Sequence, residues 1–201
     1  MSNQLNTKYH DNGVVINGIK WATRNVDKFA TFAETPESSG EFYQWNTKIP
    51  CGLSKISNYS ESENIVDNWE EINDPSPQGW RLPTTLEFAK LLDKEKVQKE
   101  WTSQNNVNGV KFTDLENDNS IFLPAVGISF SDGRTVTPTI TTISMDEVNE
   151  KTTSKLPSYG TEGKYWCGNK PCYFLGFNKY VATIRQRNSG AYGQSIRCVA
   201  K

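Results

Sequence analysis

The final third of the chain runs from Gly163-Lys-Tyr-Trp-Cys167 to Ser195-Ile-Arg-Cys-Val199. Between these two motifs, aromatic residues, glycine, asparagine and arginine alternate in short runs, and charged residues become sparse. Short alternating runs that are separated by turn residues are typical of β-strands. The pattern predicts a rigid sheet that presents side chains, with strands at Tyr165–Cys167, Tyr173–Phe177, Val181–Arg185 and Ser195–Val199.

The composition of the whole chain favours a β-rich globular protein. Its 201 residues are enough to bury a core, and 6 tryptophans and 8 tyrosines against 2 methionines argue against a helical bundle. A formal net charge of −1 lacks the basic excess expected of a nucleic-acid-binding protein. No apolar run approaches the roughly 18 residues that span a bilayer, so we expect no direct membrane insertion.

The N-terminus, Met1-Ser-Asn-Gln-Leu-Asn-Thr7, is polar and has no hydrophobic signal region. This pattern leaves a cytosolic protein, a component packaged in a particle, or a mature form whose export signal was removed. We expect a cell-surface, secreted or virion-associated protein rather than a cytoplasmic one.

Two local motifs before the final third predict elements clearly. Val14–Trp21 forms a hairpin in this prediction, because Asn17-Gly18 supplies the two positive-φ positions of a type I′ turn. Thr84 and Glu87 make a capping box that starts a helix, followed by apolar residues at helical spacing.

The remaining pattern predicts shorter pieces and one domain. We expect the helix to continue, or a second helix to start, through Asp93–Trp101. Beyond it, the sequence predicts a turn at Asn105–Gly109, strands at Val110–Thr113 and Ile121–Gly127, and a long polar loop at Thr135–Lys155. No internal repeat or linker divides the chain, so we expect a polar arm at residues 1–12 and a single domain at residues 13–201.

The sequence offers no constellation of catalytic or metal-binding residues. His10 is the only histidine and lies in the polar arm, away from any partner for acid–base work. Cys167 and Cys172 are a loose pair that fits a short disulfide or two free thiols rather than a zinc site. The stretch 114–119 lacks the glycine of a calcium loop and fits a polar hairpin turn, and the acidic stretch 67–74 fits a solvated face. We therefore expect no catalytic site, no metal and no cofactor.

Six motifs occur in one order from about Gly13 to the C-terminus. They are Val15-Ile-Asn-Gly-Ile-Lys-Trp-Ala-Thr-Arg-Asn25, Gly40-Glu-Phe-Tyr-Gln-Trp45, Asp74-Pro-Ser-Pro-Gln-Gly-Trp-Arg-Leu-Pro-Thr84, Ile121-Phe-Leu-Pro-Ala-Val-Gly127, Gly163-Lys-Tyr-Trp166 and Ser195-Ile-Arg-Cys-Val199. Together they resemble the Fibrobacter succinogenes major paralogous domain, a family common in gut Bacteroidota. That family is similar to the C-type-lectin-like fold of formylglycine-generating enzymes and of diversity-generating retroelement variable proteins.

The resemblance implies an α+β, C-type-lectin-like fold. Such a fold has a twisted, mainly antiparallel sheet, one or two helices, long loops and adjacent termini, and its first strand pairs with its last. The core would then contain Trp21, Trp80, Leu82, Phe122, Leu123, Trp166 and Ile196.

Departures from the resembled families limit what carries over. Ser76 stands where the family often has cysteine, which leaves Cys198 without its disulfide partner. Nothing matches the paired catalytic cysteines of formylglycine-generating enzymes, and the Glu-Pro-Asn or Gln-Pro-Asp motif of calcium-dependent lectins is absent. The likeness is one of scaffold, and a scaffold alone does not fix function.

The resemblance also implies where a ligand would bind. In retroelement-diversified proteins, the segment before the closing strand forms the ligand-binding face, and its variation starts largely from Asn codons. Residues that such codons can encode are Asn169, Cys172, Tyr173, Asn178, Tyr180, Thr183, Arg185, Arg187, Asn188, Ser189 and Tyr192. Scaffold positions within the same stretch, which such codons do not encode, are Lys170, Lys179, Gln186 and Gln194.

These observations predict a non-enzymatic recognition or adhesion module that binds a protein or glycan on a cell surface. Tyrosine and arginine suit such a face because they give large contact area and hydrogen bonds at modest entropic cost. One alternative is an oxidase related to formylglycine-generating enzymes, which would need Cys167 and Cys172 as a reactive pair. Another is a structural component of a surface or virion.

Overall fold

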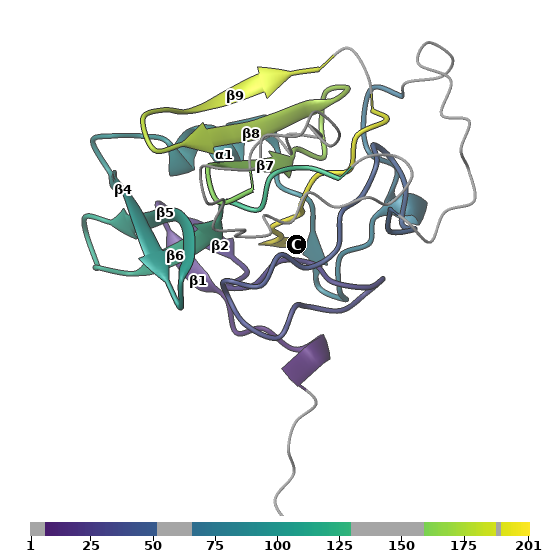
Figure 1. Cartoon of the computed structure of the whole chain (residues 1–201). Coiled ribbons are helices and arrows are strands. Elements are labelled where there is room, and N and C mark those ends of the chain that lie inside the picture. The colour runs from purple at the N-terminus through teal and green to yellow at the C-terminus, as the bar shows by residue number, and fades with distance from the viewer. Residues whose placement is uncertain (1–6, 52–65, 130–158, 188–189) are drawn as a thin grey trace, which may run out of the picture.

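The computed structural model describes residues 7–51, 66–129, 159–187 and 190–201 (Figure 1). Within these ranges the chain is mostly antiparallel sheet with one short α-helix, which is compatible with the predicted α+β class. The long polar loop expected at Thr135–Lys155 lies outside the described residues.

The first sheet joins the two ends of the described chain. Its order is β1-β2-β10-β3, with β1 at Val14–Ile16, β2 at Ile19–Trp21, β10 at Val199–Ala200 and β3 at Trp80–Arg81. Asn17 and Gly18 have φ of 46° and 74°, which confirms the predicted hairpin turn. The expectation that the first strand pairs with the last is wrong: β10 lies beside β2, with Val199 opposite Trp21. The hairpin places β1 at the outer edge, so the free edge of β2 receives β10.

The second sheet is a meander of β4 (Val97–Gln104), β5 (Val107–Asp114) and β6 (Ser120–Pro124). Asn105 and Asn106 form the turn between β4 and β5, with φ of 47° and 66°. The predicted turn at Asn105–Gly109 is therefore shorter than expected, because two asparagines in the left-handed region suffice to reverse the chain. The turn between β5 and β6 is the polar hairpin turn expected at residues 114–119.

Helix α1 covers Thr85–Leu91 and starts where the sequence predicts. The Thr84 backbone N–H donates to Glu87 Oε2 at 2.7 Å and the Glu87 backbone N–H donates to Thr84 Oγ1 at 3.2 Å, which completes the capping box. The expected continuation through Asp93–Trp101 is wrong, because Val97 already belongs to β4. A spacing of four residues, as between Val97 and Trp101, puts side chains on one side of either a helix or a strand, and the full-length pairing with β5 decides for the strand.

The third sheet contains β7 (Glu162–Trp166), β8 (Tyr173–Asn178) and β9 (Ala182–Gln186), close to the strands predicted there. The strand predicted at Ser195–Val199 is not continuous. Ser195 pairs with Tyr165 of β7, the Ile196 carbonyl accepts from the Val26 backbone N–H, and only Val199 and Ala200 form β10. This closing segment, residues 193–200, changes partner along its length and so joins the third sheet to the first.

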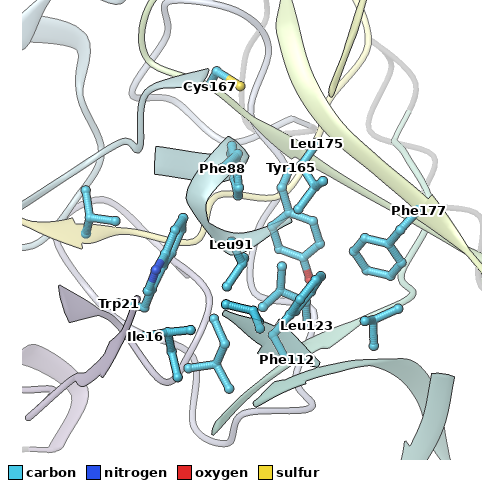
Figure 2. Packing of buried hydrophobic residues seen from close by; sticks show 14 of the residues in the cluster. Ile16, Trp21, Phe88, Leu91, Phe112, Leu123, Tyr165, Cys167, Leu175 and Phe177 are labelled. Carbon is cyan, nitrogen blue, oxygen red and sulfur yellow. The ribbon is translucent and has the colours of Figure 1, made fainter. Parts of the chain in front are cut away.

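The main core lies where the three sheets and α1 meet (Figure 2). Ile16 and Trp21 come from the first sheet, Phe112 and Leu123 from the second, and Leu175 from the third. Phe88 and Leu91 of α1 pack into the same cluster, and α1 contacts β8 and β9. One face of the β7–β8–β9 sheet is therefore fixed against the core.

The residues expected in the core from the resemblance are all buried. They are Trp21, Trp80, Leu82, Phe122, Leu123, Trp166 and Ile196. A nearby loop carbonyl satisfies the indole of Trp166, whose Nε1 donates to Tyr43 O at 2.7 Å. Trp21 differs, because its buried Nε1 has no hydrogen-bond partner among the residues that the structure describes.

Candidate functional site

Strand β9 divides its side chains between the core and the opposite side of the sheet. Ala182 and Ile184 pack against the main core, opposite Phe177 and Leu175 of β8. Because side chains alternate along a strand, Thr183 and Arg185 point to the other side. Arg185 is exposed, and its aliphatic stem runs over Gly176, where an added Cβ would lie 3.6 Å from Arg185 Cδ.

Arg187 extends this side of the sheet beyond the end of β9. Its backbone N–H donates to Cys172 O at 3.1 Å, which fixes where the side chain starts. The guanidinium carbon lies 5.6 Å from the ring centre of Phe174 and 4.6 Å from that of Tyr192. Thr183, Arg185, Arg187 and Tyr192 thus lie together, and we call them the β9 surface.

The guanidinium of Arg187 is held in place while it keeps its charge. Burial lowers the pKa of Arg187, whereas the electrostatic interactions of its guanidinium with Tyr192 and Glu162 raise it. The guanidinium group of arginine remains a cation at neutral pH in proteins. Contact with two aromatic rings stabilises the cation by cation–π attraction and limits the orientations of the side chain.

A chain of aromatic rings extends from the β9 surface on the same side of the sheet, because Phe174 is paired with Arg185 and Trp166 with Phe174. The ring of Phe174 meets that of Trp166 edge to face at 6.3 Å, Trp166 meets Trp45 at 5.5 Å, and Trp45 meets Trp69 at 5.3 Å. These rings belong to a second buried cluster, distinct from the main core. The sheet beneath Arg187 is therefore packed on both faces, which makes its position rigid.

Asn178 and Tyr180 lie at the turn between β8 and β9, apart from the β9 surface. Asn178 Oδ1 accepts from the backbone N–H groups of Tyr180 and Val181 at 2.9 and 3.0 Å. Tyr180 is 85% exposed. Both residues line a pocket of about 380 Å³ together with Trp101. The sequence analysis missed Trp101 because it placed this residue in a helix.

Asn169 has a structural role. Its Oδ1 accepts from the Thr85 backbone N–H at 2.7 Å, and its Nδ2 donates to Thr85 Oγ1 at 3.3 Å. These bonds tie the loop after β7 to the first residue of α1. Asn169 also lines a pocket of about 470 Å³, but its amide is already engaged there. The charged groups of that pocket are engaged too, since Lys201 pairs with Glu71 at 2.8 Å and Arg81 with Glu87 at 2.6 Å.

The other predicted ligand-binding residues have different positions. Cys172 is 1% exposed, so its side chain offers no surface to a ligand. The prediction missed this because the position follows a turn, where the backbone of Cys172 adopts a φ of 57° that directs the thiol into the second cluster. Tyr173 is half-buried, packs against the main core and lies under the Lys170 ammonium at 5.6 Å. Asn188 and Ser189 lie outside the described residues.

The cysteines are free thiols in an environment that suppresses their reactivity. Burial raises the pKa of Cys172 to about 11 and also raises that of Cys167. For Cys51, burial raises the pKa to about 11, although a hydrogen bond from Ser129 opposes it. A thiol with a raised pKa is protonated at neutral pH and is a poor nucleophile.

In the part of the chain that the structure describes, no group of three or more histidine, cysteine or carboxylate side chains is placed to hold a metal ion. His10 is exposed, and its Nε2 lies 2.9 Å from Asn12 Oδ1. Among the same described residues, no helix has the length and apolar character needed to cross a membrane.

Comparison of the chain with family models, with curated proteins and with solved structures returns no match.

Proposed function

We propose that this protein is a non-enzymatic recognition module that binds a protein or glycan ligand on a cell surface through the β9 surface. The supporting observation is the position of Arg187 between the rings of Phe174 and Tyr192, on a sheet packed on both faces. Arginine and tyrosine are the residue types that most often dominate binding energy at interfaces. A side chain that is already ordered loses little entropy on binding, which raises affinity.

The resemblance to C-type-lectin-like proteins belongs to this proposal. In the diversity-generating retroelement proteins of that fold, the ligand-binding face lies just before the closing strand. Thr183, Arg185, Arg187 and Tyr192 occupy the corresponding part of this chain, directly before residues 193–200. We propose the same use of the scaffold here, with diversification of these positions as its extension.

A ligand screen with matched variants tests the proposal. Purified protein is applied to arrays of surface proteins and glycans, and each ligand found is titrated against wild type and the double variant Arg185→Ala/Arg187→Ala. We expect the double variant to lose at least about tenfold in affinity. Lys111→Ala is the matched control, because Lys111 is an exposed cation on β5 of the second sheet. Equal loss in the control, or no loss in the double variant, would refute the role of the β9 surface.

The oxidase alternative can be tested separately. Its reactive pair would be Cys167 and Cys172, whose side chains are 0% and 1% exposed. Thiol labelling of the native protein with a maleimide at neutral pH should leave both residues unmodified, with full labelling after denaturation. Rapid labelling of either residue in the native protein would favour the oxidase.

A further inference from the structure

A second candidate site lies at the rim between the second and third sheets. It is a pocket of about 380 Å³ whose walls include Trp101 of β4, Asn108 of β5, and Asn178, Lys179 and Tyr180 at the end of β8. Its volume falls at the lower end of the range for small-ligand pockets. The β9 surface contributes no residue to it.

Two aromatic side chains of different character flank the pocket. Trp101 is half-buried and packs against the main core, so its ring is fixed by the sheet. Tyr180 is 85% exposed, and its backbone is held by the bond from its N–H to Asn178 Oδ1. A large ring on a fixed backbone with so little burial gains no stability from its position. It is available to pack against a ligand.

Two amide side chains in the pocket are oriented by bonds at one end. Asn178 Oδ1 accepts from two backbone N–H groups, which leaves its Nδ2 as a donor. Asn108 Nδ2 donates to Gly160 O at 3.0 Å, which leaves its Oδ1 as an acceptor. Within the described residues, neither Asn178 Nδ2 nor Asn108 Oδ1 has a hydrogen-bond partner. Two residues that line the pocket thus carry one donor and one acceptor that no described residue engages.

The charges of the pocket balance. Glu162 contributes a carboxylate whose Oε2 pairs with Lys164 Nζ at 2.9 Å, and Lys179 contributes an exposed cation. Such a lining gives no net attraction to an ionic ligand. It does supply further acceptors and donors for hydroxyl groups.

A pyranose sugar has the chemistry that matches this arrangement. One side of the ring presents C–H groups that pack on an aromatic face, and its hydroxyls both donate and accept hydrogen bonds. We propose that the pocket lined by Trp101, Asn108, Asn178 and Tyr180 binds a neutral hexose unit of a glycan. This site goes beyond the proposed function and does not depend on the β9 surface.

Binding of defined oligosaccharides tests this site. Cellotetraose, maltotetraose, mannotetraose and β-1,4-galactotetraose are each titrated into the full chain by isothermal calorimetry, up to about 10 mM to include weak sites. We expect saturable binding of at least one of them. Tyr180→Ala should weaken that binding by about tenfold or more, because it removes one stacking surface without affecting the core.

Further variants keep the result interpretable. Trp101→Phe retains a ring that packs on the core and should also weaken binding, whereas Leu115→Ala, an exposed apolar residue remote from the pocket, should not. Absence of saturable binding for all four sugars, or binding that neither Tyr180→Ala nor Trp101→Phe weakens, would overturn the proposal. Binding of a polypeptide through Trp101 and Tyr180 without any response to the sugars would assign the pocket to a peptide and overturn it equally. Arg187→Ala distinguishes the two sites. It should weaken the binding of ligands at the β9 surface and leave sugar binding unchanged.

Discussion

Arg187 and Arg197 belong to the same stretch of chain, yet they have opposite environments. Arg187 is half-buried and stacks on Phe174 and Tyr192 at the β9 surface. Arg197 is 0% exposed and lies within the closing segment. The same residue type therefore has a structural role at one position and is available to a ligand at the other.

The hydrogen bonds of Arg197 explain its structural role. Its Nε donates to Asn25 Oδ1 at 2.9 Å, and its two terminal nitrogens donate to the carbonyls of Ala22 at 3.3 Å, Pro36 at 3.4 Å and Phe122 at 3.1 Å. These acceptors belong to three separate parts of the chain, and all are neutral. A planar group with five donors can join them, which an ammonium group cannot do. The comparison teaches that burial and hydrogen-bond acceptors from distant parts of the chain, rather than residue type, decide which arginine is structural.

Replacement of Arg197 should produce the largest effect on stability. Arg197→Ala leaves three buried acceptors and the half-buried Pro36 carbonyl without their donor, and we expect a loss of about 3–5 kcal/mol in the free energy of unfolding. Urea unfolding followed by tryptophan fluorescence measures it. Arg197→Lys should give a smaller loss, because a single ammonium reaches only some of the acceptors. A loss below about 1 kcal/mol for Arg197→Ala would show that the network contributes little.

A new disulfide at the closing segment should have the next largest effect, with the opposite sign. Cys198 Sγ lies 3.1 Å from Ser76 Oγ across 122 residues of sequence. Ser76→Cys would place a second sulfur beside the first. We expect an increase of about 2–4 kcal/mol in the oxidised protein, because the bond restricts a long loop in the unfolded chain.

The oxidised and reduced forms of Ser76→Cys are compared by thermal unfolding with and without dithiothreitol. An added oxidant is required because joining two thiols removes two electrons, and the raised pKa of the buried Cys198 thiol keeps the reactive thiolate scarce. Ser76→Ala serves as the control, with no difference between the two conditions. If oxidant yields no disulfide in Ser76→Cys, the distance between the two side chains is larger in solution than the structure gives.

Acid should lower the free energy of unfolding, because it protonates the buried carboxylate of Asp11. Burial alone would raise the pKa of Asp11, but donors from Gly13 and Thr23 and the charge of Arg24 outweigh it and lower the pKa below 3.8. The carboxylate is 3.3 Å from Arg24 Nε. A lowered folded-state pKa contributes stability that is present above the unfolded pKa and is lost as the pH falls through the folded value.

The measurement is the free energy of unfolding as a function of pH, for wild type and Asp11→Asn. We expect wild type to lose stability more steeply than the variant as the pH falls below about 4, because only wild type takes up a proton at this position. Asp74 should have the opposite effect on the pH dependence of stability. Burial raises its pKa despite hydrogen bonds from Ser76 and Leu82, so its protonation in acid favours the folded state. Asp74→Asn should therefore make the acid loss steeper, and equal slopes for all three proteins would contradict both assignments.

Local motifs whose residues fit one type of backbone structure could be predicted from the sequence. Asn17-Gly18 gave the hairpin and Thr84 with Glu87 gave the start of α1, because a type I′ turn and a capping box each need those residues at that spacing. The buried aromatic core was also predictable, as for Trp166.

Features that depend on distant partners could not be predicted. Trp101 fits a helix or a strand by spacing, and only pairing with β5 decides between them. Cys172 and Tyr180 both lie in turns, and tertiary packing alone buries one and exposes the other. The candidate sites are the β9 surface and the pocket lined by Trp101 and Tyr180, and no spacing in the sequence indicates this division.

Replacement of Arg187 should have the smallest effect on stability, and it completes the comparison with Arg197. Arg187→Ala removes a side chain whose guanidinium stacks on two rings near the surface, and we expect a loss of about 0.5–1 kcal/mol in the free energy of unfolding. Urea unfolding under the conditions used for Arg197→Ala gives the difference between the two positions directly. A loss as large as that of Arg197→Ala would make Arg187 a structural residue and would remove the basis for the β9 surface as a binding site. A small loss together with weakened ligand binding would establish that one stretch of chain carries a structural arginine and a binding arginine, which differ in burial and in hydrogen-bond partners.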